Sequence, residues 1–285
     1  MTRGAKARLL AAALALAGAG AARAADVLAI LSSDSSHYRQ AYDGFREAWG
    51  ASVPVAMAGS VPARRVDAIV AFGSRAAQSE EASSPLLVTC LAPGAAPKRE
   101  GAVIRVSLVP SADELAARMK RLLPGLVRLR VLWTSEYERP DVEELAAAAR
   151  EHGFSVISQR VEDPDALPAR VRAFPGRADA LWLTPDPALV NAQNFATLRE
   201  YARAARIPFL APTEGLAEKG ATATVAVSFR DVGRAAADAL KARLEGGSVP
   251  GRVHSQRVVV TVNAAAAREI GMDVSPARGV DRTIP

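Results

Sequence analysis

Short runs of aliphatic and β-branched residues alternate along the chain with longer segments whose apolar residues have helical spacing. Ten runs have the length of a buried strand: 27–31, 68–72, 86–91, 103–107, 129–133, 154–158, 180–184, 207–211, 224–227 and 257–262. Alternation of this kind is typical of βαβ units, in which parallel strands are joined by crossover helices. The pattern therefore predicts an α/β protein built on parallel sheets.

The helical segments carry their own start and stop signals. Pro140 begins one, acidic residues fill its first turn, and Gly153 stands just past its end. A second lies between Pro187 and Ile207, and a third covers 231–245. A fourth begins at Ala112, directly after the strand at 103–107. Because strand and helix alternate on both sides of 107–111 and domains average about 150 residues, we expect two lobes joined by short crossovers.

The first 24 residues differ from the rest. Arg3, Lys6 and Arg8 precede an apolar run from Leu9 to Ala22, and Ala22-Arg23-Ala24 has the form of a peptidase site. We expect a secretory signal peptide over 1–24, cleaved after Ala24. The alternative is an uncleaved anchor, but the apolar run is shorter than the roughly 20 residues that span a bilayer.

Composition and charge exclude several classes of protein. With 49% hydrophobic and 23% charged residues the chain is globular, and its mean hydropathy of +0.07 argues against an integral membrane protein. The net charge of +6 falls to about +2 without the leader, which holds four basic residues and no acid. The remaining arginines are interspersed with acids and form no basic stripe, so nucleic acid is not an expected partner. The single cysteine, Cys90, permits neither an intramolecular disulfide nor a lipid anchor after the leader.

Hydroxyl and charged residues recur where the predicted strands end, which is where open α/β sheets bind ligands. These residues are Ser32, Ser33, Ser35, Ser74, Arg75, Thr134, Ser135, Glu136, Thr184, Asp186, Thr213 and Glu214. One interpretation is helix capping, which Ser, Thr and Asp commonly perform. The other is ligand binding: the hydroxyls and helix N-termini would hold a carboxylate, while Glu136, Asp186 and Glu214 would hold an ammonium. The combination suits a small zwitterion such as an amino acid.

Signs of catalysis are lacking. The three histidines, His37, His152 and His254, have no metal-ligand spacing, and no nucleophile-elbow, phosphate-loop, zinc-protease or dinucleotide motif occurs. Cys90 ends a buried-looking strand without a nameable thiolate partner, so a core role is expected. We therefore predict no catalytic residue, no metal site and no cofactor.

Three segments resemble the ABC-transporter substrate-binding proteins of the periplasmic-binding-protein type I architecture. They are VDAIVAFGSRAAQ (66–78), SLVPSADELAARMKRLLPGLVRLRVLW (107–133) and TEGLAEKGATATVAVSFRDVGRAAADALKARLEGG (213–247). The resemblance implies two lobes threaded by three crossovers, the first formed by 25–107 plus 229–249 and the second by 108–228 plus 250–285. It further implies a periplasmic protein that clamps one small-molecule ligand and hands it to an ABC permease in the inner membrane. It adds Ser228 to the residues expected to face the ligand, and characterised relatives take amino acids or related solutes.

The chain departs from the family pattern at three places. Ser74-Arg75 stands where members usually have Thr-Pro, and Cys90-Leu91-Ala92-Pro93 replaces a frequent Ser-Asp-Pro. The stretch between Trp49 and Val66 is short, with little to build the usual helix and strand. The expected function is a solute-binding component of an ABC importer. The alternatives are a periplasmic sensor or interaction subunit on the same fold, and a secreted hydrolase for which no residue can be named. Trp133, Tyr137 or Phe229 could supply aromatic contacts to the ligand or simply pack.

Overall fold

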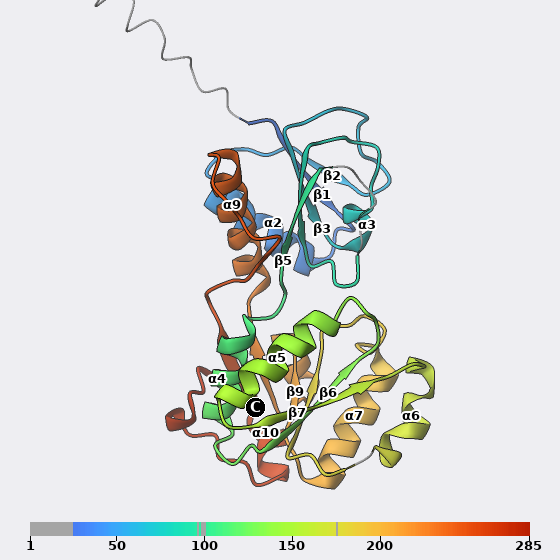
Figure 1. The fold of residues 1–285 in the computed structure, drawn as a ribbon, viewed down its shortest axis with the longest axis vertical. Coiled ribbons are helices and arrows are strands. Elements are labelled where there is room, and N and C mark those ends of the chain that lie inside the picture. Colours follow the sequence, from blue (N-terminus) through green and yellow to red (C-terminus); the bar gives the residue numbers. More distant parts are fainter. Residues whose placement is uncertain (1–24, 96, 98–100, 175) are drawn as a thin grey trace, which may run out of the picture.

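A computed structural model describes residues 25–95, 97, 101–174 and 176–285, and the predicted signal peptide lies outside them. Two α/β lobes are joined by chain segments on one side of the molecule (Figure 1). Each lobe is built on one sheet, and the sheets have six and seven strands in the described residues. The predicted α/β class with two parallel-dominated sheets is confirmed.

The first lobe contains a fully parallel sheet with the strand order β11-β5-β4-β3-β1-β2. Its strands are β1 (Val27–Leu31), β2 (Val55–Met57), β3 (Ala68–Phe72), β4 (Leu86–Cys90), β5 (Ala102–Val106) and β11 (Arg252–Val253). Every residue of β1, β3 and β4 is buried, as expected of central parallel strands covered on both faces. The short helix α3 (Ser74–Ala77) lies on one face, and α2 (Ser36–Trp49) and α9 (Phe229–Leu244) cover the other.

Helices α2 and α9 lie side by side although they come from opposite ends of the chain (Figure 1). Two glycines allow the close approach. A Cβ at Gly233 would overlap the carbonyl oxygen of Ala41, and a Cβ at Gly44 would overlap that of Arg230. Phe45 and Leu240, both fully buried, pack beneath this contact against the sheet. The first lobe is therefore completed by a helix made late in the chain.

The second lobe contains a sheet with the strand order β13-β12-β10-β9-β8-β6-β7. Its strands are β6 (Arg128–Trp133), β7 (Ser155–Arg160), β8 (Ala180–Leu183), β9 (Phe209–Ala211), β10 (Ala223–Ala226), β12 (Val259–Asn263) and β13 (Arg282–Ile284). All neighbours are parallel except β10 and β12, which pair antiparallel where the chain returns from the first lobe.

Two separate cores cover the two faces of this second sheet. Helices α4 (Ala112–Leu122), α5 (Arg139–Glu151) and α10 (Ala264–Glu269) contribute to the core on one face. The segments α6 (Leu167–Arg170), α7 (Ala192–Ala205) and α8 (Glu214–Glu218) contribute to the other. Single 3-10 turns are η1 (Pro164–Ala166), η2 (Val171–Ala173) and η3 (Pro276–Arg278). Local capping agrees with the sequence: the Ser111 and Asn191 side chains accept from backbone amides at the starts of α4 and α7.

All ten predicted strands are present, each within two residues of its predicted ends. The stretch between Trp49 and Val66, expected to have little to build the usual helix and strand, does form a strand: Val55–Met57 is β2 and pairs with β1. Strands β11 and β13 were also not predicted, since two or three residues are too few to show an alternating pattern. The pairing of β11 with β5 brings Arg252–Val253 into the first sheet, slightly beyond the predicted lobe boundary at 249.

Three segments connect the lobes: residues 107–111 after β5, 227–228 between β10 and α9, and 254–258 between β11 and β12. Among the described residues, no helix combines the length and apolar composition that crossing a bilayer requires.

Candidate functional site

The carboxyl ends of the strands in the two lobes face each other. β5 leaves the first lobe at its carboxyl end, and β10 leaves the second lobe at its carboxyl end. Because β1, β3 and β4 run parallel to β5, and β6, β8 and β9 run parallel to β10, all these strand ends lie on the side of each sheet that faces the other lobe. We call these two rows of residues the lobe-facing edges.

Contacts between the lobes occur beside the crossovers. Arg252 of β11 forms ion pairs with Asp141 and, at 3.6 Å, with Glu144, both on α5. The guanidinium of Arg105 on β5 lies 5.9 Å from the centre of the Tyr137 ring. Burial raises the pKa of Asp141, and the charge of Arg252 opposes that rise.

At the lobe-facing edge of the first lobe, Ser32 is tied into the fold. It is 7% exposed, its amide donates to Phe72 O at 2.9 Å, and its Oγ accepts from the amide of Ala76 at 3.0 Å. The turn between β3 and α3 packs directly on it, because a Cβ at Gly73 (φ 98°) would overlap Ser32 Oγ. The Ser32 hydroxyl thus fixes the turn that carries Ser74 and Arg75.

The next two serines are less committed. Ser33 is exposed, and its Oγ lies 3.3 Å from Ser35 Oγ. Ser35 precedes α2 without a side-chain cap bond and lies 3.2 Å from His37 Nε2. The His37 ring packs on Tyr38 with centroids 4.1 Å apart, and burial lowers the pKa of His37.

Ser74 and Arg75 follow β3. Ser74 Oγ donates to Pro93 O over 3.5 Å, a weak bond. Arg75 is exposed, and Nη2 lies 3.9 Å from where a Cβ of Gly59 would stand, in the turn after β2. Within the described residues no carboxylate pairs with Arg75. Beyond β4 the side chains of Cys90, Leu91 and Ala92 are buried, so this strand end offers no polar side chain.

In the second lobe, Asp186 and its neighbours form a closed hydrogen-bond set. Asp186, 3% exposed, accepts from the Thr134 amide at 2.9 Å, from the Thr134 hydroxyl, and from the Ala188 amide at 3.0 Å. Thr184, also buried, donates to Leu132 O at 2.9 Å. Both carboxylate oxygens of Asp186 are therefore occupied: Oδ2 joins the ends of β6 and β8, and Oδ1 holds the loop that follows β8.

Sequence reasoning missed Glu138, the other buried acid at this edge. Glu138 is 4% exposed and accepts from the Ser135 amide at 3.2 Å and from the Ser135 hydroxyl. Burial raises its pKa, with a smaller contribution from the Asp186 charge, while the bonds from Ser135 act in the opposite direction. Glu138 directly precedes α5, where an acid is common at any helix start, so no sequence signal separates it from its exposed neighbours.

Glu136 lies in an exposed cluster with two arginines. It pairs with Arg139 at 2.7 Å and with Arg160 at 3.0 Å. The same two guanidiniums lie 5.9 and 5.7 Å from the Trp133 ring, whose indole N–H donates to Ser158 Oγ at 2.8 Å. Trp133 is 7% exposed and thus packs within this cluster.

The remaining predicted site residues lie at the ends of β9 and β10. Thr213 precedes α8 without a side-chain cap bond, and Glu214 forms an ion pair with Arg282 of β13. Ser228 caps α9: its Oγ accepts from the Asp231 amide at 3.0 Å and donates to Asp231 Oδ2 at 2.6 Å. Thus the structure brings Thr134, Thr184 and Asp186 together and keeps Glu136 and Glu214 in separate ion pairs.

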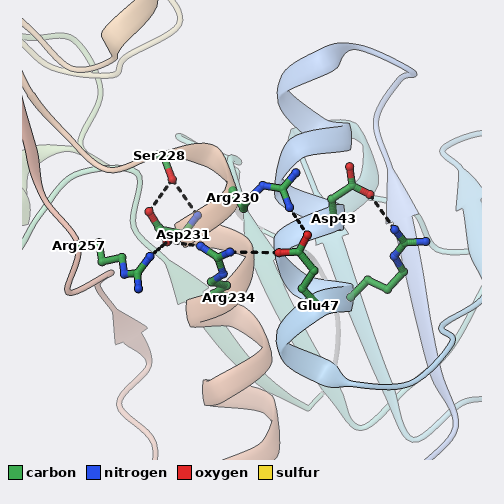
Figure 2. A network of polar contacts seen from close by, with 8 residues as sticks. Asp43, Glu47, Ser228, Arg230, Asp231, Arg234 and Arg257 are labelled. Atoms are coloured by element: carbon green, nitrogen blue, oxygen red, sulfur yellow. Dashed lines mark hydrogen bonds and ion pairs between the residues drawn. The ribbon is translucent and has the colours of Figure 1, made fainter. Parts of the chain in front are cut away.

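Figure 2 shows an ion-pair network linking α2, α9 and the third crossover. Asp231 pairs with Arg234 at 2.8 Å and with Arg257 of the crossover at 3.8 Å. Arg234 continues to Glu47 of α2 at 3.1 Å, and Glu47 also pairs with Arg230. The Arg230 guanidinium lowers the pKa of Glu47. The first lobe is thus connected to the crossover through the N-terminal turn of α9.

The histidines and the cysteine lie in separate parts of the described structure. No group of three His, Cys, Asp or Glu side chains in the described part of the chain could hold a metal ion. His152 Nε2 lies 2.8 Å from Asp113 Oδ1, and His254 Nδ1 lies 3.1 Å from Val109 O. His37, in contrast, lies beside Ser35 in the first lobe. Cys90 is fully buried, and burial raises the pKa of its thiol, which keeps the sulfur protonated.

Residues 101–277 match the family model described as ABC transporter substrate binding protein. Among solved structures, a Streptococcus pneumonia ABC domain in complex with L-Trp superposes with a TM-score of 0.64 at 17% identity, covering 91% of this chain and 99% of that one. A ligand-free, open substrate binding protein with adhesive properties from Clostridium difficile superposes at 0.63 and 18%, with the same coverage. At identities this low, the superpositions show that the chains share a fold.

Among curated proteins, an uncharacterized protein of Rickettsia prowazekii is 28% identical over 125 residues. The matched part is 44% of this chain and 41% of that protein, so it spans less than half of the relative's length.

Proposed function

The chain belongs to the ABC transporter substrate-binding protein family, and on that premise we propose that it captures a small polar solute, an amino acid or a related molecule, between its two lobes and delivers it to an ABC permease in the inner membrane. Family members are generally not enzymes, and we propose that this chain performs no chemistry either. Binding would be reversible and would draw the lobes together around the solute.

The observation that carries the proposal is the opposition of the two lobe-facing edges. The strand ends of the two lobes, which are rich in hydroxyl and charged side chains, face each other. The ion pair and ring contact described between the lobes lie beside the crossovers. Ligands of α/β sheets bind beyond the carboxyl ends of the strands, and here two such ends would enclose one molecule.

We propose a division of labour among the predicted site residues. Eight residues with exposed or partly exposed side chains would contact the ligand: Ser33, Ser35, Ser74, Arg75, Ser135, Glu136, Thr213 and Glu214. The other five would hold the strand ends and the start of α9 in place through the bonds described above: the buried Ser32, Thr184 and Asp186, the partly exposed Thr134, and the exposed helix cap Ser228.

We further propose a periplasmic location, with the leader 1–24 removed after Ala24. Members of this family are typically exported. N-terminal sequencing of the protein from a periplasmic fraction should begin at Ala25, and recovery of the leader on the mature protein would exclude cleavage. The lobes would comprise 25–107 plus 229–253 and 108–228 plus 254–285, the second boundary following the pairing of β11.

Thermal denaturation of the purified protein against amino acids, nucleosides, sugars and small carboxylates tests the main proposal. A ligand at about 100 times its Kd stabilises a protein by about 2.7 kcal/mol, which raises Tm measurably. A saturable shift with one chemical class would support solute capture. Absence of a shift with every compound, in protein refolded to remove bound ligand, would contradict it and favour the sensor or interaction subunit on the same fold.

A further inference from the structure

The charged groups at the two lobe-facing edges differ in whether they already have a partner. Glu136 is shared by Arg139 and Arg160, and Glu214 pairs with Arg282. An ammonium arriving at either carboxylate would have to displace a guanidinium and would meet its positive charge at close range. Asp186 is buried, and both of its oxygens accept hydrogen bonds from the protein. None of these three acids is therefore prepared to receive a cation.

Arg75 is in the opposite condition. It is the second residue of α3 at the lobe-facing edge, directly after the turn that Ser32 and Gly73 fix through close packing. Its side chain is exposed and extends beside Gly59 in the turn after β2, and within the described residues its guanidinium has no ion-pair partner. A guanidinium presents parallel N–H donors that match both oxygens of one carboxylate.

We propose that the ligand of this protein is a small organic carboxylate held by Arg75, and that an ammonium group on the ligand is not required for binding. The inference rests on the proposed function and narrows its substrate class. Arg75 contributes little while the lobes are apart, because an exposed guanidinium is well hydrated. Its contact with the ligand strengthens as closure removes water.

One exposed acid at the second lobe-facing edge could oppose this selectivity. Glu162 follows β7 and has no ion-pair partner in the part of the chain that the structure describes. It belongs to the end of an edge strand, β7, whereas Arg75 follows a strand in the interior of its sheet. Glu162→Gln is therefore the variant to compare with Arg75→Gln, because it removes a negative charge, unpaired among the described residues, from the opposite edge.

The proposal is tested on the intact protein with matched compounds that lack either the ammonium or the carboxylate group of one amino acid. Titration calorimetry would compare 3-phenylpropionate, phenylalanine and 2-phenylethylamine, then 4-methylpentanoate, leucine and 3-methylbutylamine, and finally the pair glutarate and glutamate. We expect at least one deaminated acid to bind and every monoamine without a carboxylate to fail. In Arg75→Gln the Kd of that acid should rise about tenfold to a hundredfold, as for loss of a charged hydrogen bond. Arg75→Lys should lie between the two proteins.

Arg243→Gln is the matched control, because Arg243 is exposed at the far end of α9. The Kd of this variant for the same acid should stay at the wild-type value. Binding of an amine or amino acid but of no deaminated acid, with loss of affinity in Glu162→Gln, would overturn the proposal while leaving solute capture intact. Binding of an uncharged sugar or nucleoside, unchanged in Arg75→Gln, would do the same. Failure of every compound to bind the wild-type protein would instead reject the proposed function, and this inference with it.

Discussion

The two lobes are stabilised at different places. In the second lobe, buried polar side chains at the lobe-facing edge bond to one another: Thr134 to Asp186, Ser135 to Glu138, and Thr184 to Leu132 O. In the first lobe the close packing joins two helices instead of strand ends: Gly44 and Gly233 let α2 and α9 touch, and Glu47 of α2 pairs with two arginines of α9. An edge whose buried acids are hydrogen-bonded thus faces an edge with uncommitted groups.

This difference shows why polar residues at strand ends are ambiguous. Asp186 and Arg75 both follow a buried strand, yet one holds two strands together and the other has no partner among the described residues. In the sequence, a polar residue after a buried strand is expected equally of a residue that stabilises the fold and of one that binds a ligand. Only the partners of each side chain separate a structural residue from one that is available to a ligand.

The largest expected effect is in the first lobe. Gly233→Ala would place a methyl group against the Ala41 carbonyl, forcing α9 away from α2, and should lower the free energy of unfolding by about 3 kcal/mol. Urea denaturation measures this loss. Gly215→Ala is the control, since nothing lies within 4 Å of a Cβ there, and it should leave stability unchanged or slightly raised. Equal stability of the two variants would show that the helix contact does not hold the lobe.

The next effect is in the second lobe. In Asp186→Asn an NH2 group, which cannot accept a hydrogen bond, replaces one carboxylate oxygen. Either the bonds from Thr134 or the bond from Ala188 is therefore lost, and we expect the free energy of unfolding to fall by about 2 kcal/mol. Chemical denaturation and ligand titration on the same variant separate the two roles of this residue. Weaker ligand binding with unchanged stability would transfer Asp186 to the ligand-contacting group and remove the contrast between the edges.

A smaller effect is expected at the crossover. Ser228→Ala removes the N-cap of α9 and should cost about 1 kcal/mol of stability without changing ligand affinity. Ser228→Asp, which restores a capping oxygen, should recover part of the loss. If affinity falls while Tm remains constant, Ser228 contacts the ligand and the crossover belongs to the binding surface.

The subtlest test uses pH. Because the pKa of Glu138 is raised above its ordinary 4.5 in the folded protein, its contribution to stability is fully present below that pH and is lost as pH rises through the folded-state pKa. Glu138→Gln keeps the group neutral. The stability of the wild type relative to this variant should therefore decline between pH 4.5 and neutrality in denaturant titrations. A constant or rising difference would mean that the bonds from Ser135 outweigh burial.

The strands and most helix ends were predictable because they depend on local patterns. The fully buried run at Val27–Leu31, and Gly153 after α5, are each explained within a few residues of chain. β2 and β11 were missed because their pairing with long central strands, rather than their own composition, makes them strands. The site was only partly predictable. The burial of Glu138 near the charge of Asp186, and the pairing of Arg252 with Asp141, both depend on segments that are distant in the sequence.

The late position of α9 in the chain has a consequence for the order of folding. Glu47 and Arg234 are 187 residues apart, so the core that contains Phe45 of α2 and Phe72 of β3 stays incompletely covered until nearly the whole polypeptide is available. Strands β6 to β10 lie within one continuous stretch, 128–226, and their contacts close much shorter loops. The β6 to β10 part of the second lobe should therefore form first, before α9 returns to α2 and before β12 and β13 complete the second sheet. A nascent or partly translocated chain would meanwhile expose an aromatic surface that chaperones can recognise.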